Sequence, residues 1–255
     1  MKVALISDIH GNLEALTAVL NHAFKQNVDQ IYCLGDVIGY GPRQHACLQL
    51  VKKCCNNILR GNHEDAFLSG KSYYRMSQYA REGIDFAKKT LTANDVAIIN
   101  NTVPTITLKY INARLCHASM LGDCNWRYIS HIEEAERNIE KMDTQLLIIG
   151  HTHVPFIFSS DSNSHKHMKE LSIDFIKDLS QPVILSSNHK YILNVGSVGQ
   201  PRDRDCRSAY GIIEKNENVL TYTLHRVFYD IKRTAEEIKE NNLSDFLAER
   251  LFKGG

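Results

Sequence analysis

The first half of the chain alternates short apolar runs with amphipathic stretches. Residues 3–6 (Val-Ala-Leu-Ile) form a continuous apolar run, which is typical of a strand buried on both faces. Leu13, Leu16 and Leu20 then recur at helical spacing, which predicts a helix after this strand. The same order continues with strands at 30–34 and near 57–59 and with helices at 44–55 and 72–89. Repeated strand–helix units predict a largely parallel, doubly wound sheet.

The second half is richer in strands. Its apolar and alternating runs predict strands at 105–110, 113–116, 145–149, 154–158, 191–195, 209–214 and 219–227. Helical patterns cover 131–141, a short stretch at 171–179, and the tail 231–252 with a break near residues 241–242. Because no internal repeat or Pro-rich linker interrupts the chain, we expect a single domain over residues 1–255, with the polar segment 159–181 as a candidate insertion.

Composition and charge narrow the classes of function. Lys plus Arg is 30 and Asp plus Glu is 29, so the net charge of +1 argues against extended nucleic acid as a partner. No apolar stretch approaches a membrane span and no signal peptide opens the chain, so we expect no membrane partner. The seven cysteines form no CxxC pair and lie mostly in apolar runs, which indicates reduced thiols and a cytoplasmic protein. The unusual number is 12 histidines, because imidazole is the commonest metal ligand.

Metal-ligand residues follow the ends of five predicted strands. These side chains are Asp8, His10, Asp36, Asn62, His117, His151 and His153. Ligands of open α/β sheets gather at the carboxyl ends of the strands, so we expect these residues to converge. Each of these short motifs alone occurs by chance, as His165 and His167, which we interpret as a surface pair, illustrate. Their occurrence together and in this order is specific for a ligand-binding site.

The size and chemistry of this set predict a dinuclear centre. Seven ligands are too many for one tetrahedral zinc ion and suit two ions bridged by one carboxylate. Mixed oxygen and imidazole ligands without thiolate favour Mn, Fe, Co, Ni or Zn over Mg or Ca. We therefore expect two divalent transition-metal ions, with Mn²⁺ as the first choice. The chain has neither the HExxH motif of zinc proteases nor the P-loop motif of nucleotide-dependent switch proteins, so neither class is indicated.

The order of these motifs resembles the calcineurin-like metallophosphoesterase superfamily. Asp-x-His, Gly-Asp, Gly-Asn-His-Glu, a lone His and Gly-His-Thr-His follow one another at residues 8–10, 35–36, 61–64, 117 and 150–153. The chain resembles one small bacterial, phosphodiesterase-like branch of this superfamily over longer stretches of sequence. These stretches are residues 7–13, 35–42, 194–203, 229–231 and 248–251. The resemblance thus covers nearly the whole chain.

The resemblance implies an α/β fold in which two mixed β-sheets form an α/β/β/α sandwich flanked by helices. It also implies two ligand sets, Asp8, His10, Asp36 and His153 for one ion and Asp36, Asn62, His117 and His151 for the other. Asp36 is then the bridging ligand, and a hydroxide between the ions attacks phosphorus in line. His63 follows Asn62 and is expected to protonate the leaving alkoxide.

The chain departs from the protein serine/threonine phosphatases of this superfamily at two positions. Those enzymes carry an Asp that orients the catalytic histidine and then an Arg that grips phosphate, whereas this chain has Gly39 and Tyr40. A protein phosphatase is therefore a weaker interpretation. Glu64, Asp65 or a backbone carbonyl are the candidates for orienting His63.

Substrate contacts are expected from a second group of residues. Asn12, Arg202 and the backbone N–H groups of the loop 196–199 are candidates for holding phosphate. For Arg202, an ion pair with Asp203 or Asp205 is an equally supported alternative. The segment 159–181 is a candidate cap over the site, an oligomer contact or a surface loop.

These observations predict an enzyme. The expected activity is a dinuclear metal-dependent phosphoesterase that hydrolyses a small phosphodiester or phosphomonoester. The alternatives are a dinucleoside polyphosphate hydrolase, a protein phosphatase and, from another class, a non-catalytic metal-binding scaffold like one eukaryotic trafficking subunit of this superfamily. The presence of His63 together with all seven ligands favours the enzyme, because a scaffold has no need of them.

Overall fold

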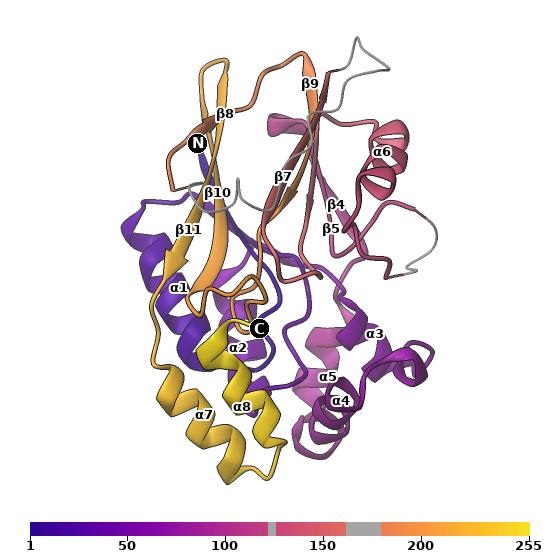
Figure 1. The fold of residues 1–255 in the computed structure, drawn as a ribbon, viewed down its shortest axis with the longest axis vertical. Helices are drawn as coiled ribbons and strands as arrows, with labels where there is room; N and C mark the ends of the chain where they lie inside the picture. The colour runs from indigo at the N-terminus through magenta and orange to yellow at the C-terminus, as the bar shows by residue number, and fades with distance from the viewer. Residues whose placement is uncertain (122–125, 162–179) are drawn as a thin grey trace.

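The computed structural model of this chain describes residues 1–121, 126–161 and 180–255 (Figure 1). Its strands are β1 (Lys2–Ile6), β2 (Gln30–Cys33), β3 (Asn57–Ile58), β4 (Thr105–Leu108), β5 (Ala113–Cys116), β6 (Leu146–Ile149), β7 (Phe156–Asp161), β8 (Val183–Ile184), β9 (His189–Asn194), β10 (Ser208–Asn216) and β11 (Val219–Val227). Its α-helices are α1 (Leu13–Lys25), α2 (Gln44–Cys54), α3 (Asn62–Ser69), α4 (Gln78–Thr90), α5 (Ala93–Asn100), α6 (Ile132–Lys141), α7 (Ile231–Glu240) and α8 (Asp245–Lys253), and two short 3₁₀ turns are η1 (Tyr73–Arg75) and η2 (Lys109–Ile111).

The strands form two mixed sheets. In the first sheet the order is β3-β2-β1-β10-β11-β8, with β1, β2 and β3 parallel and β10 antiparallel to β1. In the second the order is β4-β5-β6-β9-β7, with β5, β6 and β9 parallel and the two edge strands antiparallel. The expected pair of mixed sheets is therefore confirmed.

The apolar side chains divide into layers that follow from strand geometry. Alternate residues of β1 point to opposite faces, so Ala4 and Ile6 join the apolar cluster under α1 and α2, while Val3 and Leu5 join the cluster between the two sheets. The outer face of the second sheet packs against α6 in a separate cluster. The layers are thus helices, sheet, sheet and helix, as the resemblance implies (Figure 1).

Several predicted elements differ from the observed ones. The helix expected at 72–89 begins only at Gln78, after a 3₁₀ turn, because Ser77 caps α4 by accepting a hydrogen bond from the N–H of Ala80. The structure adds α3, α5 and the two-residue strand β8, none of which the sequence pattern predicted. The tail divides at residues 241–242 into α7 and α8, as predicted.

The short helix expected at 171–179 and most of the segment 159–181 lie outside the described residues. Among the helices that the structure describes, none is long and apolar enough to cross a membrane.

Candidate metal centre

Loops from both sheets meet at the carboxyl ends of the parallel strands. The backbone N–H of Asp8 donates to Gly35 O (3.1 Å), which joins the loops after β1 and β2. The N–H of His151, after β6, donates to Oδ2 of Asp8 (2.9 Å) and so links the second sheet to the first. The structure brings all seven predicted ligands to this edge, and all but the half-buried Asn62 are buried.

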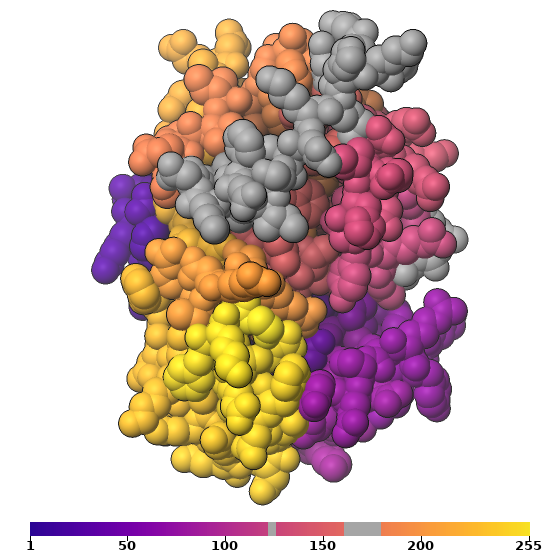
Figure 2. Space-filling view, in the orientation of Figure 1, coloured from indigo at the N-terminus to yellow at the C-terminus, as the bar shows by residue number. Residues whose placement is uncertain are grey.

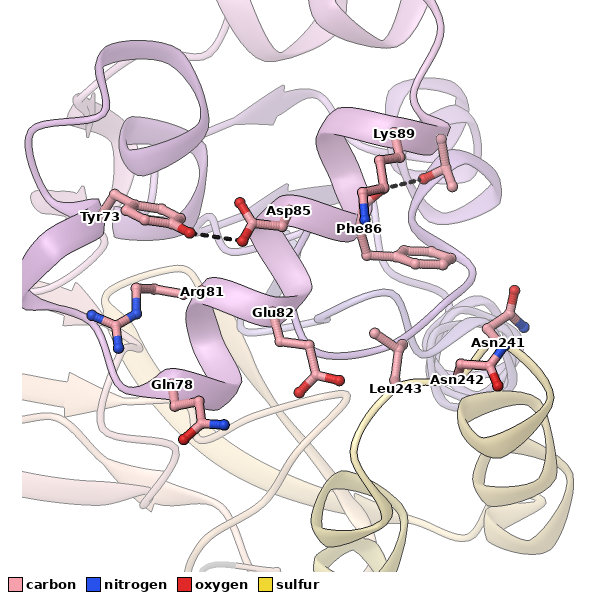
Figure 3. A pocket seen from close by; sticks show the side chains of 11 residues that line it. Tyr73, Gln78, Arg81, Glu82, Asp85, Phe86, Lys89, Asn241, Asn242 and Leu243 are labelled. Atoms are coloured by element: carbon pink, nitrogen blue, oxygen red, sulfur yellow. Dashed lines mark hydrogen bonds between the residues drawn. The ribbon is translucent and has the colours of Figure 1, made fainter.

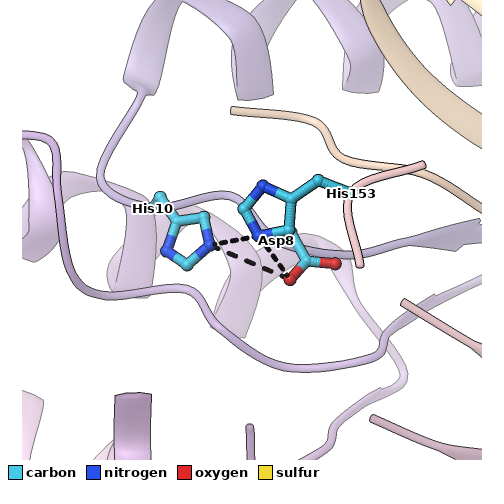
Figure 4. Close-up of side chains that lie close together, drawn as sticks. All are labelled: Asp8, His10 and His153. Atoms are coloured by element: carbon cyan, nitrogen blue, oxygen red, sulfur yellow. Dashed lines mark hydrogen bonds and ion pairs between the residues drawn. The ribbon is translucent and has the colours of Figure 1, made fainter. Parts of the chain in front are cut away.

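Two carboxylates lie at the centre of the histidine cluster. Oδ1 of Asp8 is 3.2 Å from Nε2 of His153 and 3.8 Å from Nε2 of His10 (Figure 4). Oδ2 of Asp36 is 3.3 Å from Nε2 of His117 and 3.8 Å from Nε2 of His10. The two carboxylates therefore define two neighbouring groups of ligands that share the ring of His10.

Backbone carbonyls orient three of the rings. Nδ1 of His10 bonds Ile38 O (3.0 Å), Nδ1 of His117 bonds Leu34 O (2.9 Å), and Nδ1 of His153 bonds Gln200 O (2.6 Å). A carbonyl only accepts, so each Nδ1 carries a proton, and Nε2 is the ring nitrogen that faces the cluster.

His151 has the opposite arrangement. Its Nε2 bonds the carbonyl of Trp126 (2.9 Å), so Nε2 carries the proton and Nδ1 keeps the lone pair. This Nδ1 is the atom of His151 that is left to bind a metal. All four histidines thus turn one ring nitrogen toward the centre.

Five ligand residues occupy the left-handed backbone region. The φ angles are 56° at Asp8, 50° at His10, 54° at Asp36, 68° at His151 and 61° at His153. Non-glycine residues adopt this region at a free-energy cost of about 1–3 kcal/mol each and do so mainly at functional sites. These five residues therefore keep a backbone conformation that lowers the stability of the fold and directs their side chains toward one point.

Burial and mutual charge set the protonation of the cluster. Burial acts to raise the pKa of Asp36, but its interactions with the facing rings, with that of His117 first, outweigh burial and hold that pKa well below its usual range. Burial lowers the pKa of His10. For His117, burial is outweighed by the carboxylates of Asp36 and Asp8, which raise its pKa to about 9. Two ionised carboxylates with facing imidazoles form a site for cations.

The donor set fits divalent metal ions. Oδ1 of Asp8 is buried and makes no hydrogen bond. A buried carboxylate oxygen without a hydrogen bond fits a metal-ligand atom, because a bound cation would satisfy it. The ligand atoms of Asp8, His10 and His153 lie within 4.8 Å of one another, and those of Asp36, His117 and His151 do so too. Imidazole nitrogens and carboxylate oxygens without thiolate suit transition-metal ions.

The structure places His63 beside this centre, in the first turn of α3. Its Nε2 is 3.9 Å from Oδ2 of Asp36, and its backbone N–H donates to the other oxygen of Asp36 (2.9 Å). The three expected candidates do not orient the ring, because Nδ1 of His63 is buried without a hydrogen-bond partner. Instead the ring packs between Tyr40 and His10, at centroid distances of 4.9 Å and 4.7 Å.

Gly39 leaves the space that the His63 ring fills. A Cβ at residue 39 would overlap Nδ1 of His63, and the φ of Gly39 is +94°. We expect Gly39→Ala to lower kcat/KM by about a hundredfold, because a ring displaced by about 1 Å loses its working geometry. Gly70→Ala is the matched control, since its φ is +69° and nothing lies within 4 Å of the added Cβ. Equal activity of the two variants, measured with an aryl phosphoester, would contradict this prediction.

Glu64 supports the bridging loop, a function that sequence reasoning did not assign. Its fully buried carboxylate accepts the N–H groups of Asp36 (2.8 Å), Val37 (2.8 Å), Ile38 (3.2 Å) and Gly61 (2.9 Å). Burial and the charge of Asp36 raise the pKa of Glu64 to about 7, while the N–H bonds act in the opposite direction. The Gly-Asn-His-Glu motif thus contains the predicted ligand Asn62 and the predicted proton donor His63. Its last residue, Glu64, holds the loop that carries Asp36.

Asn12 has a structural position. Its amide oxygen accepts from the N–H of Ala15 (3.1 Å), which caps α1, and from Oγ1 of Thr234 (3.0 Å), while its Nδ2 donates to Gly199 O (2.9 Å). A contact of Asn12 with phosphate stays a prediction.

Arg202 lies beside the centre and does not form the alternative ion pair. Its Nη2 donates to Gln200 Oε1 (2.9 Å) and to the hydroxyl of Tyr40 (3.3 Å). The two neighbouring acids are bound elsewhere, Asp203 by Arg226 and Asp205 by Arg207.

A separate hollow of about 600 Å³ lies between α4 and the turn that joins α7 to α8 (Figure 3). Arg81 and Lys89 line it together with Glu82 and Asp85, so its charges are mixed. None of the predicted site residues is in its walls, and we assign it no role in the chemistry.

Comparison with known proteins agrees with this geometry. Residues 1–218 match the family model of the calcineurin-like phosphoesterase superfamily domain. An uncharacterized protein of Methanocaldococcus jannaschii is 31% identical over 99% of this chain and 98% of its own length. The crystal structure of a metallophosphoesterase from Sphaerobacter thermophilus is 33% identical with a TM-score of 0.80, covering 100% of this chain and 99% of that one. A hypothetical protein from Pyrococcus horikoshii, 15% identical, shares the fold with a TM-score of 0.75 over 100% and 98% of the two chains. This chain is a member of the calcineurin-like phosphoesterase superfamily.

Proposed function

We propose that this protein hydrolyses a small phosphomonoester or phosphodiester with two bound divalent metal ions. The observation that carries the proposal is the position of Asp36, whose Oδ2 lies within 3.9 Å of Nε2 of His10, His63 and His117. One carboxylate thus faces ligands of both proposed ions and the proposed proton donor.

The residues divide between the two ions as follows. Asp8, His10, Asp36 and His153 would hold one ion, and Asp36, Asn62, His117 and His151 the other. When bound, two such ions lower the pKa of water and stabilise the charge that develops on the phosphoryl oxygens. We propose Mn²⁺ as the working metal, with Fe, Co, Ni and Zn as alternatives that the same donors accept.

The chain's own groups supply the rest of the chemistry. His63 would give a proton from Nε2, the ring nitrogen that faces Asp36, to the departing alkoxide. Arg202 presents a guanidinium beside Tyr40 that can hold phosphoryl oxygens. The buried walls of the cluster limit access of bulk water and so strengthen both interactions.

Two rival functions are disfavoured by particular residues. Gly39 and Tyr40 occupy the positions at which the family's protein phosphatases carry Asp and Arg, and the ring of His63 fills the space beside Gly39. A non-catalytic scaffold does not require the buried His63 or Glu64, both of which are held in place here.

The test begins with metal-free protein, reloaded separately with Mn²⁺, Fe²⁺, Co²⁺, Ni²⁺ or Zn²⁺. We expect the Mn²⁺ form to hydrolyse 4-nitrophenyl phosphate or bis(4-nitrophenyl) phosphate, and a chelator to stop turnover. The ratio of the two rates assigns a preference for monoester or diester. If no metal-loaded form turned over either ester, the proposed function would be wrong.

A further inference from the structure

An aromatic segment, residues 126–130, borders one half of the metal centre. The ring of Tyr128 lies 4.5 Å from the ring of His151, centroid to centroid, and the two planes are inclined by 34°. The ring of Trp126 lies 5.8 Å from that of His117. Because His117 and His151 belong to the same proposed ligand set, both aromatic side chains lie beside ligands of one ion.

Both ends of this segment are held in place. At one end, Nε1 of Trp126 donates to Oγ of Ser72 (3.1 Å), and the carbonyl of Trp126 accepts from Nε2 of His151 (2.9 Å). At the other end, Ile129 is buried in the apolar cluster under α6. Figure 2 shows the two regions that the segment joins, with the pink part of the chain that includes α6 directly above the purple part that includes α3. Tyr128 lies between the two anchors, so the fold fixes its position.

The ring of Tyr128 packs against the metal ligand with one face only. Two rings whose centroids are 4.5 Å apart must overlap face to face, because van der Waals contact keeps rings that lie side by side further apart. Tyr128 is nevertheless 47% exposed, whereas His151 is 7% exposed. The exposed surface of Tyr128 therefore lies on the opposite face and on the edge of its ring.

The position of this open face is unusual among the exposed aromatic side chains. In the described part of the chain, Tyr128 is the exposed aromatic residue whose ring contacts a predicted metal ligand. An aromatic face in contact with water gains free energy when another planar ring covers it, through buried apolar area and through offset stacking. Stacking of this kind accepts any flat ring, because it uses the π-face and no hydrogen bond.

We propose that Tyr128 is a stacking platform, which binds a planar ring in the ester group of the substrate. A phosphoryl group at the buried centre has to project its ester group outward, and the exposed face of Tyr128 borders the centre beside His151. The substrate class is then a phosphoester whose alcohol part carries an aromatic ring. The inference rests on the proposed function for the binding of the phosphoryl group.

The experiment compares two phosphonates that cannot be hydrolysed as esters, because a carbon atom replaces the ester oxygen. Benzylphosphonate carries an aromatic ring, and ethylphosphonate does not. The binding of each to the Mn²⁺-loaded protein is measured by calorimetry at a fixed concentration of free Mn²⁺. We expect the wild type to bind benzylphosphonate about tenfold more tightly than ethylphosphonate, and Tyr128→Ala to lose this preference, since it removes both the stacking and the buried apolar area.

Three further variants separate stacking from other effects. Tyr128→Phe keeps an aromatic ring and should keep the preference, whereas Tyr128→Leu keeps only apolar bulk and should lose most of it. Phe24→Ala is the matched control, because Phe24 is 52% exposed and lies in the last turn of α1, at the opposite end of that helix from Asn12. This control should change neither affinity.

Equal weakening of both phosphonates by Tyr128→Ala would mean that the ring only supports His151, and would overturn the platform. A wild type without the preference, or a Tyr128→Leu variant that kept it in full, would overturn the platform too. A thermal melt shows whether each variant is folded, and if Tyr128→Ala is unfolded, the contrast between Tyr128→Leu and Tyr128→Phe decides.

The outcome is independent of turnover. A preference for benzylphosphonate that depends on Tyr128, without hydrolysis of any ester, would support the platform and refute the proposed function. Hydrolysis of aryl esters without such a preference would do the reverse.

Discussion

Replacement of Asp36 by asparagine is expected to lower kcat/KM by about a thousandfold or more and to leave the purified protein with fewer than two bound metal ions. Oδ2 of Asp36 lies 3.3 Å from Nε2 of His117 and 3.8 Å from Nε2 of His10, so this one oxygen faces both proposed ions. An amide removes the negative charge that holds the two cations together, and its N–H₂ end would face the imidazoles.

The measurement pairs metal analysis of the protein with steady-state kinetics on an aryl phosphoester. Asp143→Asn is the matched control, because that aspartate is largely exposed and pairs with Arg114 at the surface. The control should keep two metal ions and full activity. An Asp36→Asn variant that retained both metal ions and wild-type turnover would contradict the bridging role.

The parts of the fold that could be predicted are those that have a local signal. The apolar run at residues 3–6 requires burial on both faces, and β1 is buried between α1 and the second sheet as expected. The ligands could be found because each follows the end of a strand, where parallel strands bring their carboxyl ends together. The break near residues 241–242 also has a local cause, since two asparagines interrupt the helical pattern of the tail.

The parts that could not be predicted depend on contacts between distant residues. The carbonyl of Trp126 orients His151 although nothing in its own sequence marks it. Glu64 supports residues 36–38, which precede it by almost thirty positions and belong to another loop. The end of α8 docks on residues 204–205 through Gly254, a contact that no local pattern announces. Periodicity carries no information on such pairings, so only the folded chain reveals them.

The sequence left open what orients His63, for a related reason. The sequence offered Glu64, Asp65 or a carbonyl as its partner, but Glu64 binds backbone N–H groups and Asp65 binds Ser72. The ring is held by packing against Tyr40 and His10 instead. This packing requires a residue without a side chain at position 39, because a Cβ there would overlap the His63 ring. In the sequence, Gly39 is noticeable only because the related protein phosphatases carry an Asp at this position.

His63→Ala is expected to separate proton transfer from metal binding. General acid catalysis contributes about 10²- to 10⁴-fold to a rate, so hydrolysis of an alkyl phosphoester should fall by that factor. An activated aryl leaving group departs without a proton, so its hydrolysis should fall far less. The metal content should stay at the wild-type value, because His63 is outside both proposed ligand sets and its distance from Asp36 Oδ2 is 3.9 Å.

The dependence on leaving group distinguishes this function from a structural one. Loss of the ring leaves a void between Tyr40 and His10, and a void that disturbed the metal ions would slow alkyl and aryl esters equally. Burial lowers the pKa of His63 to about 4, so the ring is neutral at neutral pH and its single proton must lie on Nε2 to serve the leaving group. His131→Ala, which changes an exposed histidine at the N-terminus of α6, should change neither rate. Equal losses for the two leaving groups, with metal retained, would assign His63 to ground-state support rather than proton transfer.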